Sequence, residues 1–292
     1  MSLKISRVDT SRCLIGEGPV WDASAQALYF LDIAQKRVHR FDPREGVTRS
    51  WYTPAPVGAM ALREAGGAVL AMGDSICSID FDSGSVGPIA KAHAQHPQAT
   101  FNDGKVDKRG RFIIGSCCTD LLSPQPVGGV FSLGPGHEIA CLQREICFSN
   151  SPCFSPDGRI FYFSDSALYA CYAYDYDNDS GTLSNKRLFA DTRALGGMPD
   201  GATVDSDGLV WMAIFRGGKV VAFRPDGRIE RVVEMPVRLP GSTMFGGARL
   251  DQLFVPTIDP AFFNEPAEEG AGYLYVIEGL GARGLPEPRY AG

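Results

Sequence analysis

The chain repeats one pattern six times: a run of aromatic and β-branched residues, a polar turn, and a second run in which polar and apolar residues alternate. Runs of this composition favour β-strands, and recurring Asp-Gly pairs favour tight turns between them. A period of about 40 to 50 residues in such a chain indicates a radial repeat with one four-stranded sheet per unit. The six units begin at Ala27, Ala68, Arg111, Ile160, Leu209 and Gln252.

Four polar residues recur in phase with this repeat. Each stands five positions ahead of an aspartate or serine that follows a short apolar run, as in EGPVWD at 17–22. In a propeller the innermost strand of each blade runs along the central channel, so we expect the residue just ahead of that strand at the channel mouth. Val57 and Met244 occupy this place in the two remaining units. The four polar residues are Glu17, Asn102, Asn150 and Asp200.

We therefore predict an all-β fold, a six-bladed β-propeller with four-stranded antiparallel blades around a central metal-containing channel. A β-sandwich, or two of them, is the main alternative, but a sandwich would not place one polar position in phase at the head of several repeats. No linker or low-complexity stretch interrupts the chain, so residues 1–292 are predicted to form a single domain.

The four side chains in phase supply two carboxylates and two carboxamides, and none of the four histidines lies in their segments. An all-oxygen ligand set favours a hard divalent cation such as calcium, magnesium or manganese. Zinc or ferrous iron remains compatible with an open site that keeps water ligands. A purely structural alternative is that these residues cap the innermost strands, since Asn and Asp commonly bond nearby backbone amides.

Other groups that suggest chemistry are expected to be structural. His93 and His96 are spaced like a metal pair, but their surroundings predict a solvated loop. The acidic stretch 175–179 is predicted to be a hairpin turn, because it lacks the helical flanks and the final glutamate of an EF-hand. The eight cysteines have no regular spacing and are predicted to be reduced, mostly packed thiols, including the adjacent Cys117 and Cys118.

Charge and hydropathy exclude several classes of partner. The net charge of -6 and the pI near 5.3 disfavour nucleic acid, which needs a basic face. No apolar run is long enough to span a membrane, and the N-terminus lacks the apolar core of a signal peptide, so we expect a cytoplasmic protein. A closed propeller has no free sheet edge that demands a partner, which predicts a monomer or a weak homo-oligomer.

Motifs spread over nearly the whole chain form a specific combination, although no single one is specific. They are GEGPVW at 16–21, FNDGKVD at 101–107, SN at 149–150, SNKR at 184–187, PDG at 199–201, FGG at 245–247 and GLGARGLP at 279–286. With these motifs the chain resembles the family of regucalcin (senescence marker protein), gluconolactonase and luciferin-regenerating enzyme. The resemblance implies a six-bladed propeller that hydrolyses sugar lactones with a divalent metal.

The resemblance also implies residue roles. Glu17, Asn150 and Asp200 match the metal ligands of the family, and Asp200 also matches its catalytic acid and base. Asn102 is similar to a residue that contacts the substrate, and Asp120 aligns with a carboxylate that binds sugar hydroxyls.

Thr100 marks a departure from the family, because regucalcin-like members often carry arginine two residues before the asparagine. Loss of that guanidinium removes a bidentate donor, so Thr100 is predicted to shape the substrate wall and to change the sugar preference.

The predicted activity is the opening of sugar (aldono-) lactones, such as gluconolactone or a pentonolactone, to the free sugar acid. The cofactor is predicted to be one divalent ion, with calcium expected in vitro and zinc, manganese, magnesium or ferrous iron as alternatives. Two other functions remain open: a propeller phosphotriesterase that hydrolyses organophosphates, and a non-catalytic calcium-binding regulatory protein.

Overall fold

The computed structural model describes residues 2–8, 11–91, 96–120 and 122–292. These residues form six four-stranded antiparallel sheets and three short 3-10 helices. The predicted all-β class, a six-bladed β-propeller with four-stranded antiparallel blades, is therefore confirmed. The chain divides into two compact units, unit 1 (1–52 and 192–287) and unit 2 (53–191 and 288–292), and each unit is described by itself. The single domain over 1–292 stays a prediction.

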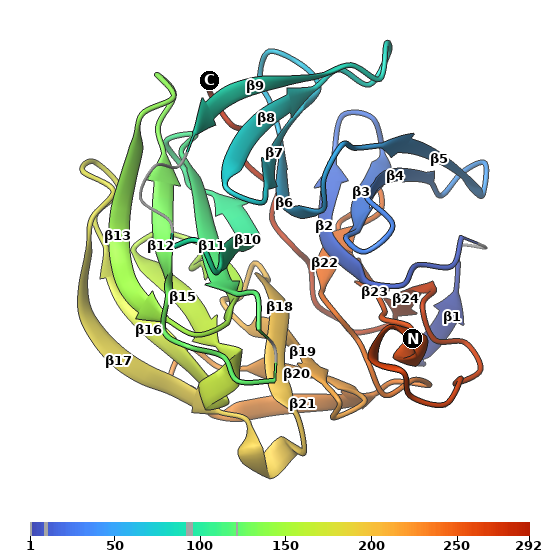
Figure 1. Cartoon of the computed structure of the whole chain (residues 1–292). Coiled ribbons are helices and arrows are strands. Elements are labelled where there is room, and N and C mark those ends of the chain that lie inside the picture. The colour runs from blue at the N-terminus through green and yellow to red at the C-terminus, as the bar shows by residue number, and fades with distance from the viewer. Residues whose placement is uncertain (1, 9–10, 92–95, 121) are drawn as a thin grey trace. The chain divides into compact units, whose positions relative to one another are not determined.

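Unit 1 contains three sheets, in which the strand order is β2-β3-β4-β5, β18-β19-β20-β21 and β22-β23-β24-β1 (Figure 1). The third sheet joins the two ends of the sequence, because β1 pairs antiparallel with β24 and places Ile5 opposite Ile277. The elements are β1 (Lys4–Arg7), β2 (Gly16–Asp22), β3 (Ala27–Asp32), β4 (Arg37–Asp42), β5 (Val47–Tyr52), η2 (Arg193–Leu195), β18 (Met198–Val204), β19 (Val210–Phe215), β20 (Lys219–Phe223), β21 (Ile229–Glu234), β22 (Met244–Gly246), β23 (Gln252–Pro256), η3 (Pro260–Phe263) and β24 (Leu274–Glu278).

Unit 2 contains the other three sheets, each built from four strands consecutive in sequence. Their innermost strands β6, β10 and β14 follow one another in space, since β10 contacts both β6 and β14. The elements are β6 (Val57–Leu62), β7 (Ala68–Met72), β8 (Ser75–Ile79), β9 (Val86–Lys91), β10 (Ala99–Val106), β11 (Phe112–Cys118), β12 (Gly128–Leu133), β13 (Ile139–Ile146), β14 (Ser149–Phe154), β15 (Ile160–Asp165), η1 (Ser166–Leu168), β16 (Ala170–Tyr176) and β17 (Leu183–Asp191).

Burial falls from the inner strands of a sheet to its outer strand. Every residue of β3, β7 and β11 is buried, whereas most residues of the outermost strands β5 and β21 are exposed or half-buried. This explains why the second strand of each unit reads as a continuous apolar run, because both of its faces pack against neighbouring sheets. Aromatic rings fill the space between sheets, as where Trp211 meets Phe245 edge to face with ring centroids 5.9 Å apart.

The aspartate or serine that ends each recurring polar motif has a structural role. In unit 1, Asp205 follows β18, and its Oδ1 accepts the N–H groups of Asp207 (3.0 Å) and Leu209 (2.9 Å). These bonds close the tight turn that leads into the next strand. The corresponding residues Asp22, Asp107 and Ser155 accept backbone N–H groups in the same way.

Several smaller predictions are confirmed by the described residues. The acidic stretch near 175–179 forms the hairpin turn between β16 and β17, where Asp177 Oδ1 accepts two backbone N–H groups. All eight cysteines are free thiols and most are buried. Burial raises the pKa of Cys117 to about 12, so this thiol stays protonated at neutral pH. His93 lies outside the described residues, while His96 is exposed.

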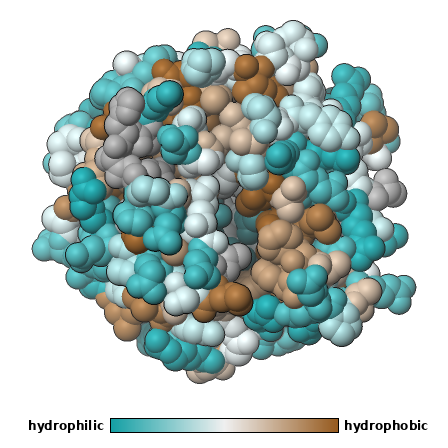
Figure 2. Space-filling model, viewed as in Figure 1, coloured by the Kyte–Doolittle hydropathy of each residue, from teal (hydrophilic) through white to brown (hydrophobic). Residues whose placement is uncertain are grey.

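No helix in the described part of the chain is long and apolar enough to cross a membrane. On the face drawn in Figure 2, hydrophilic residues surround scattered hydrophobic ones, as is ordinary for a protein surface.

We predict that the buried His39 on β4 makes the stability of the protein depend on pH. Its ring is 2% exposed, and burial together with the charge of Arg37 lowers its pKa from 6.5 to about 4. Between these values the unfolded chain takes up a proton that the folded chain does not, so stability is lost as pH falls from about 6.5 to about 4. The full contribution is on the order of 3 kcal/mol.

We expect urea unfolding, with a chelator present to remove any bound metal, to show this fall in unfolding free energy with pH in the native chain. The pH dependence should be flatter in His39→Gln. His96→Gln, which changes an exposed histidine, should leave the slope unchanged. Equal pH slopes for the native chain and His39→Gln would contradict the assignment.

Candidate metal and substrate site

The four polar residues in phase lie inside innermost strands, next to β-bulges. The sequence predicted them just ahead of these strands. In the structure each lies one to three residues after the first residue of its strand. Strand pairing begins earlier because each strand continues past an irregularity in its register. The shifts fall at 17–20 in β2, 101–104 in β10, 150–153 in β14 and 199–202 in β18. A bulge bends a strand and re-aims a side chain, which is why bulges are frequent beside functional sites.

At three of these bulges the following residue has a left-handed backbone. The φ angles are 52° at Gly18, 59° at Asp103 and 58° at Ser151. Glycine adopts this conformation without cost, and a short polar side chain can support it with local hydrogen bonds. The Gly18 N–H donates to Oε2 of Glu17 (2.9 Å), so the bulge also fixes that carboxylate.

Unit 1 brings Glu17 and the strand of Asp200 to the same glycine, Gly241. A Cβ on Gly241 would lie 2.6 Å from the Gly16 carbonyl oxygen and 2.8 Å from Glu17 Oε1, so the backbone leaves no room for a larger residue beside this carboxylate. On its other side, the carbonyl oxygen of Gly241 accepts the N–H of Gly201 (2.8 Å), the residue directly after Asp200. Glu17 and Asp200 are 8% and 7% exposed, so both carboxylates are buried.

Unit 2 joins Asn102 directly to Asn150. Asn102 Nδ2 donates to the Ser149 carbonyl oxygen (2.8 Å) and to Asn150 Oδ1 (3.0 Å), and Asn150 Nδ2 donates to Ser166 Oγ (3.0 Å). The Ser149 carbonyl oxygen can only accept, so it fixes the nitrogen end of the Asn102 amide, and that donor in turn fixes the oxygen end of the Asn150 amide. Asn150 Oδ1 keeps a second lone pair that can coordinate a cation, while Asn102 Oδ1 can accept a hydroxyl.

Asp103 was not predicted from the sequence, yet it ties the two bulges of unit 2 together. Its Oδ2 accepts the Ser151 N–H (2.9 Å) and its Oδ1 accepts the Gly104 N–H (2.8 Å). Burial raises its pKa to about 6, against the opposing effect of these two N–H donors and of Lys105. The only sequence signal was its place in the motif FNDGKVD, where the preceding Asn102, and not Asp103, is in phase with the repeat.

The two remaining predicted substrate residues lie elsewhere in unit 2. Thr100 is half-buried on β10, opposite Cys117 of β11. Asp120 is exposed, and its Oδ1 accepts the N–H groups of Leu122 (3.0 Å) and Ser123 (3.1 Å). No hydrogen bond links Asp120 to the other predicted site residues among the residues described in unit 2, so its substrate contact stays a prediction.

The residues present fit a hard divalent ion. Buried carboxylates in unit 1 and an oriented carboxamide oxygen in unit 2 are the ligand types that calcium, magnesium and manganese prefer. Coordination of a single ion by Glu17, Asp200 and Asn150 stays a prediction, because each unit is described by itself.

Comparison with known proteins identifies the family. A family model described as SMP-30/Gluconolactonase/LRE-like region matches residues 15–259, and the chain belongs to this family. Regucalcins of Oryctolagus cuniculus and Homo sapiens are each 32% identical to it over 299 residues, covering 100% of this chain and 99% of theirs.

Solved structures share the fold at lower identity. A luciferin-regenerating enzyme matches with a TM-score of 0.91 and 23% identity over 100% of both chains. A calcium-binding protein, regucalcin, from Agrobacterium tumefaciens matches with a TM-score of 0.89 and 24% identity, over 98% of this chain and 97% of that one. A gluconolactonase from Xanthomonas campestris gives 0.75 and 20%, over 94% and 89%.

Proposed function

We propose that the chain is a divalent-metal-dependent hydrolase that opens sugar (aldono-) lactones to the free sugar acids. The observation that carries this proposal is membership of a gluconolactonase-like family over residues 15–259, a range that contains Glu17, Asn150 and Asp200, the metal ligands implied by the resemblance. A solved structure of the same fold is itself a gluconolactonase, which supports the reaction class.

In the proposed reaction Glu17, Asn150 and Asp200 are the metal ligands. A bound divalent ion supplies Lewis-acid polarisation of the lactone carbonyl and charge stabilisation in the transition state. Asp200 takes a proton from the attacking water and returns it to the ring oxygen that leaves. The hydrogen bond from Asn102 to Asn150 holds the Asn102 amide so that its oxygen can accept a substrate hydroxyl.

Substrate recognition is assigned to residues of unit 2. Asn102 and Asp120 are proposed to bind ring hydroxyls, and Thr100 to line the wall beside them. Threonine offers one hydroxyl where related proteins often carry a guanidinium, so the preferred lactone should have fewer acceptors at that position.

A lactone panel on metal-stripped protein tests the proposal. Gluconolactone and pentonolactones are offered after calcium, zinc, manganese or ferrous iron is added back in turn. We expect negligible turnover without metal and recovery with at least one ion. If no lactone is opened with any ion while calcium still binds, the non-catalytic calcium-binding function replaces this one, and preferential hydrolysis of organophosphate esters would identify a phosphotriesterase.

A further inference from the structure

Three buried side chains of unit 1 form a cluster that the sequence prediction missed. Cys13 precedes β2, Asp32 ends β3 and His39 lies on β4. Each offers one ligand atom, and these atoms all lie within 4.8 Å of one another. The three residues are 2%, 1% and 2% exposed, so the cluster is closed to solvent.

The ring of His39 is held with one nitrogen engaged and the other without a partner. Nδ1 lies 2.8 Å from Ser50 Oγ on β5, and the ring stacks on Phe30 with centroids 4.8 Å apart. Nε2 is buried and has no hydrogen-bond partner. A buried polar atom without a partner destabilises the fold, and a bound ion is one partner that would remove this cost.

Backbone bonds fix the other two members of the cluster. Asp32 Oδ2 accepts the Leu14 N–H (2.9 Å), and its Oδ1 accepts the N–H groups of Gln35 (3.0 Å) and Ile15 (3.3 Å). Oδ2 therefore retains a lone pair that can bind an ion. The Cys13 N–H donates to the Gly272 carbonyl oxygen (2.7 Å), which anchors the segment that carries the thiol. Such outer contacts are the ones that orient ligands in metal sites.

The ligand chemistry selects zinc. A thiolate, an imidazole and a carboxylate are zinc ligands, whereas calcium and magnesium prefer oxygen alone. One thiolate and one carboxylate balance the charge of a divalent ion, which lowers the cost of burying it. The Arg37 guanidinium lies near His39 and opposes a cation, but it is drawn to Tyr52, whose ring it covers at 4.7 Å and whose hydroxyl accepts its Nη2 (2.7 Å).

We propose that Cys13, Asp32 and His39 bind a structural zinc ion through Sγ, a carboxylate oxygen and Nε2. Three protein ligands leave the fourth position of the tetrahedron to a water molecule that is enclosed with the ion. The ion joins the segment before β2 to β3 and β4 and so stabilises the first sheet of unit 1. This site is separate from the lactonase proposal and does not depend on it.

Zinc affinity of the full chain, measured by competition with a chromophoric chelator, tests the site. We expect Cys13→Ala and His39→Gln to bind zinc at least about 100-fold more weakly, and Ser50→Ala to bind it about 10- to 100-fold more weakly. Cys171→Ala removes another fully buried thiol, in unit 2, and should bind zinc like the native chain.

Cobalt substitution distinguishes this site from the predicted catalytic ion. The native chain and Asp200→Ala should both show a thiolate-to-cobalt charge-transfer band, and Cys13→Ala should not. Absence of the band in the native chain, or an unchanged zinc affinity in a folded Cys13→Ala, would overturn the proposal. If Cys13→Ala does not fold, the native cobalt spectrum and the affinity of Ser50→Ala decide.

Discussion

Asp200→Ala should lower lactone turnover by about 10³-fold or more while the protein still folds. The side chain is proposed both to bind the ion and to transfer the proton, so its removal takes away two contributions to the transition state. The turn after β18 is held by Asp205, so closing this turn does not depend on Asp200. Steady-state kinetics with saturating metal measures the effect, and circular dichroism confirms folding.

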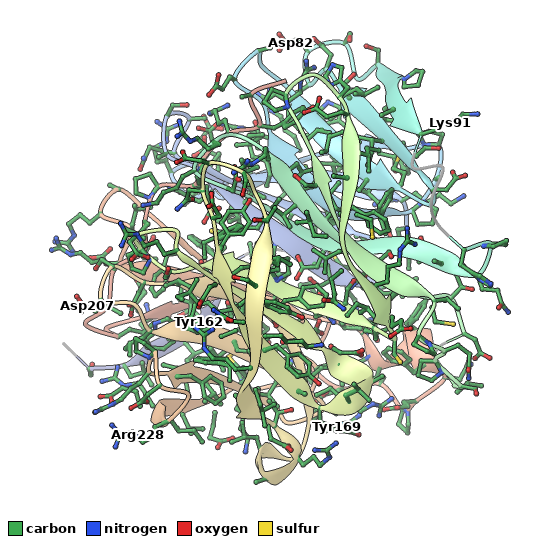
Figure 3. The ribbon with its side chains drawn as sticks, turned by 90° about the vertical axis from the view of Figure 1, so that its left-hand side faces the viewer. Asp82, Lys91, Tyr162, Tyr169, Asp207 and Arg228 are labelled. Carbon is green, nitrogen blue, oxygen red and sulfur yellow. The ribbon has the colours of Figure 1, made fainter. Side chains whose placement is uncertain are left out.

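Asp200→Asn separates the two roles of this residue. Asparagine keeps one ligand oxygen but cannot accept the proton, so we expect metal binding to weaken moderately and turnover to stay close to that of Asp200→Ala. Asp207→Ala is the matched control, because it removes an exposed aspartate from the turn after β18 (Figure 3) and should leave kcat/KM unchanged. Appreciable turnover in Asp200→Ala would remove this residue from the mechanism.

The repeat predicted the fold because burial of a second strand on both faces leaves a direct trace in the sequence. Runs such as Ala68–Met72 and Phe112–Cys118 are mostly apolar, are buried throughout and recur at one period. The bulges left no such trace. A register shift is a property of the pairing between two strands, so Glu17 and Asn150 were placed ahead of their strands although they lie within them.

The spacing of the polar residues in phase with the repeat predicted where they lie in each sheet better than it predicted what each residue does. Asp205 and Asp107 share the motif with the proposed site residues, yet they close turns. Cys13, Asp32 and His39 have no recognisable spacing, since they meet only through the pairing of β3 with β4 and the path of the segment before β2. Contacts of that kind depend on tertiary structure, and a single sequence does not reveal them.

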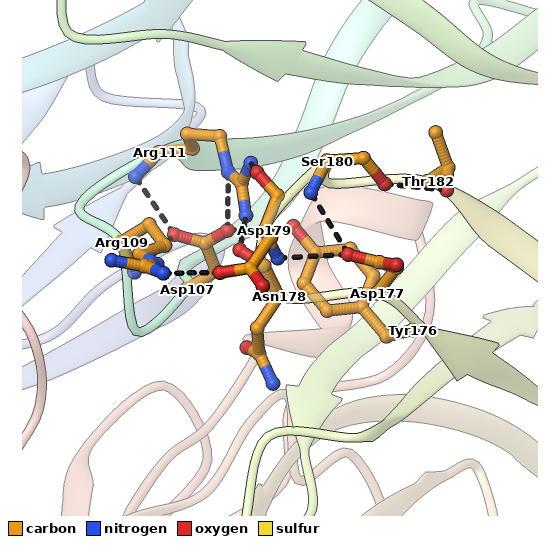
Figure 4. A network of polar contacts seen from close by, with 9 residues as sticks. All are labelled: Asp107, Arg109, Arg111, Tyr176, Asp177, Asn178, Asp179, Ser180 and Thr182. Carbon is orange, nitrogen blue, oxygen red and sulfur yellow. Dashed lines mark hydrogen bonds and ion pairs between the residues drawn. The ribbon is translucent and has the colours of Figure 1, made fainter.

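Asp107 is the centre of the buried polar network of unit 2 (Figure 4). It is 1% exposed, and its Oδ2 accepts Arg111 Nε and the Tyr176 hydroxyl, both at 2.6 Å. Its Oδ1 accepts the N–H groups of Arg109 and Arg111, both at 2.9 Å. Arg111 in turn donates from Nη2 to the Asn178 carbonyl oxygen (2.6 Å), so one carboxylate connects the turn after β10 to the hairpin that joins β16 and β17.

Asp107→Ala should therefore destabilise the protein by about 3–5 kcal/mol. The mostly buried Arg111 guanidinium and the buried Tyr176 hydroxyl would both lose the carboxylate that accepts their hydrogen bonds. Arg109→Ala is the matched control: it removes an ion pair with Asp179 whose side chains are 62% and 82% exposed, and it should cost less than about 1 kcal/mol. Urea unfolding midpoints of the two variants measure the difference, with Asp107→Asn as the substitute if the alanine variant does not fold. Similar midpoints for Asp107→Ala and Arg109→Ala would contradict the assignment, since Asp107 accepts four hydrogen bonds in a buried network whereas the Arg109 side chain makes one exposed ion pair.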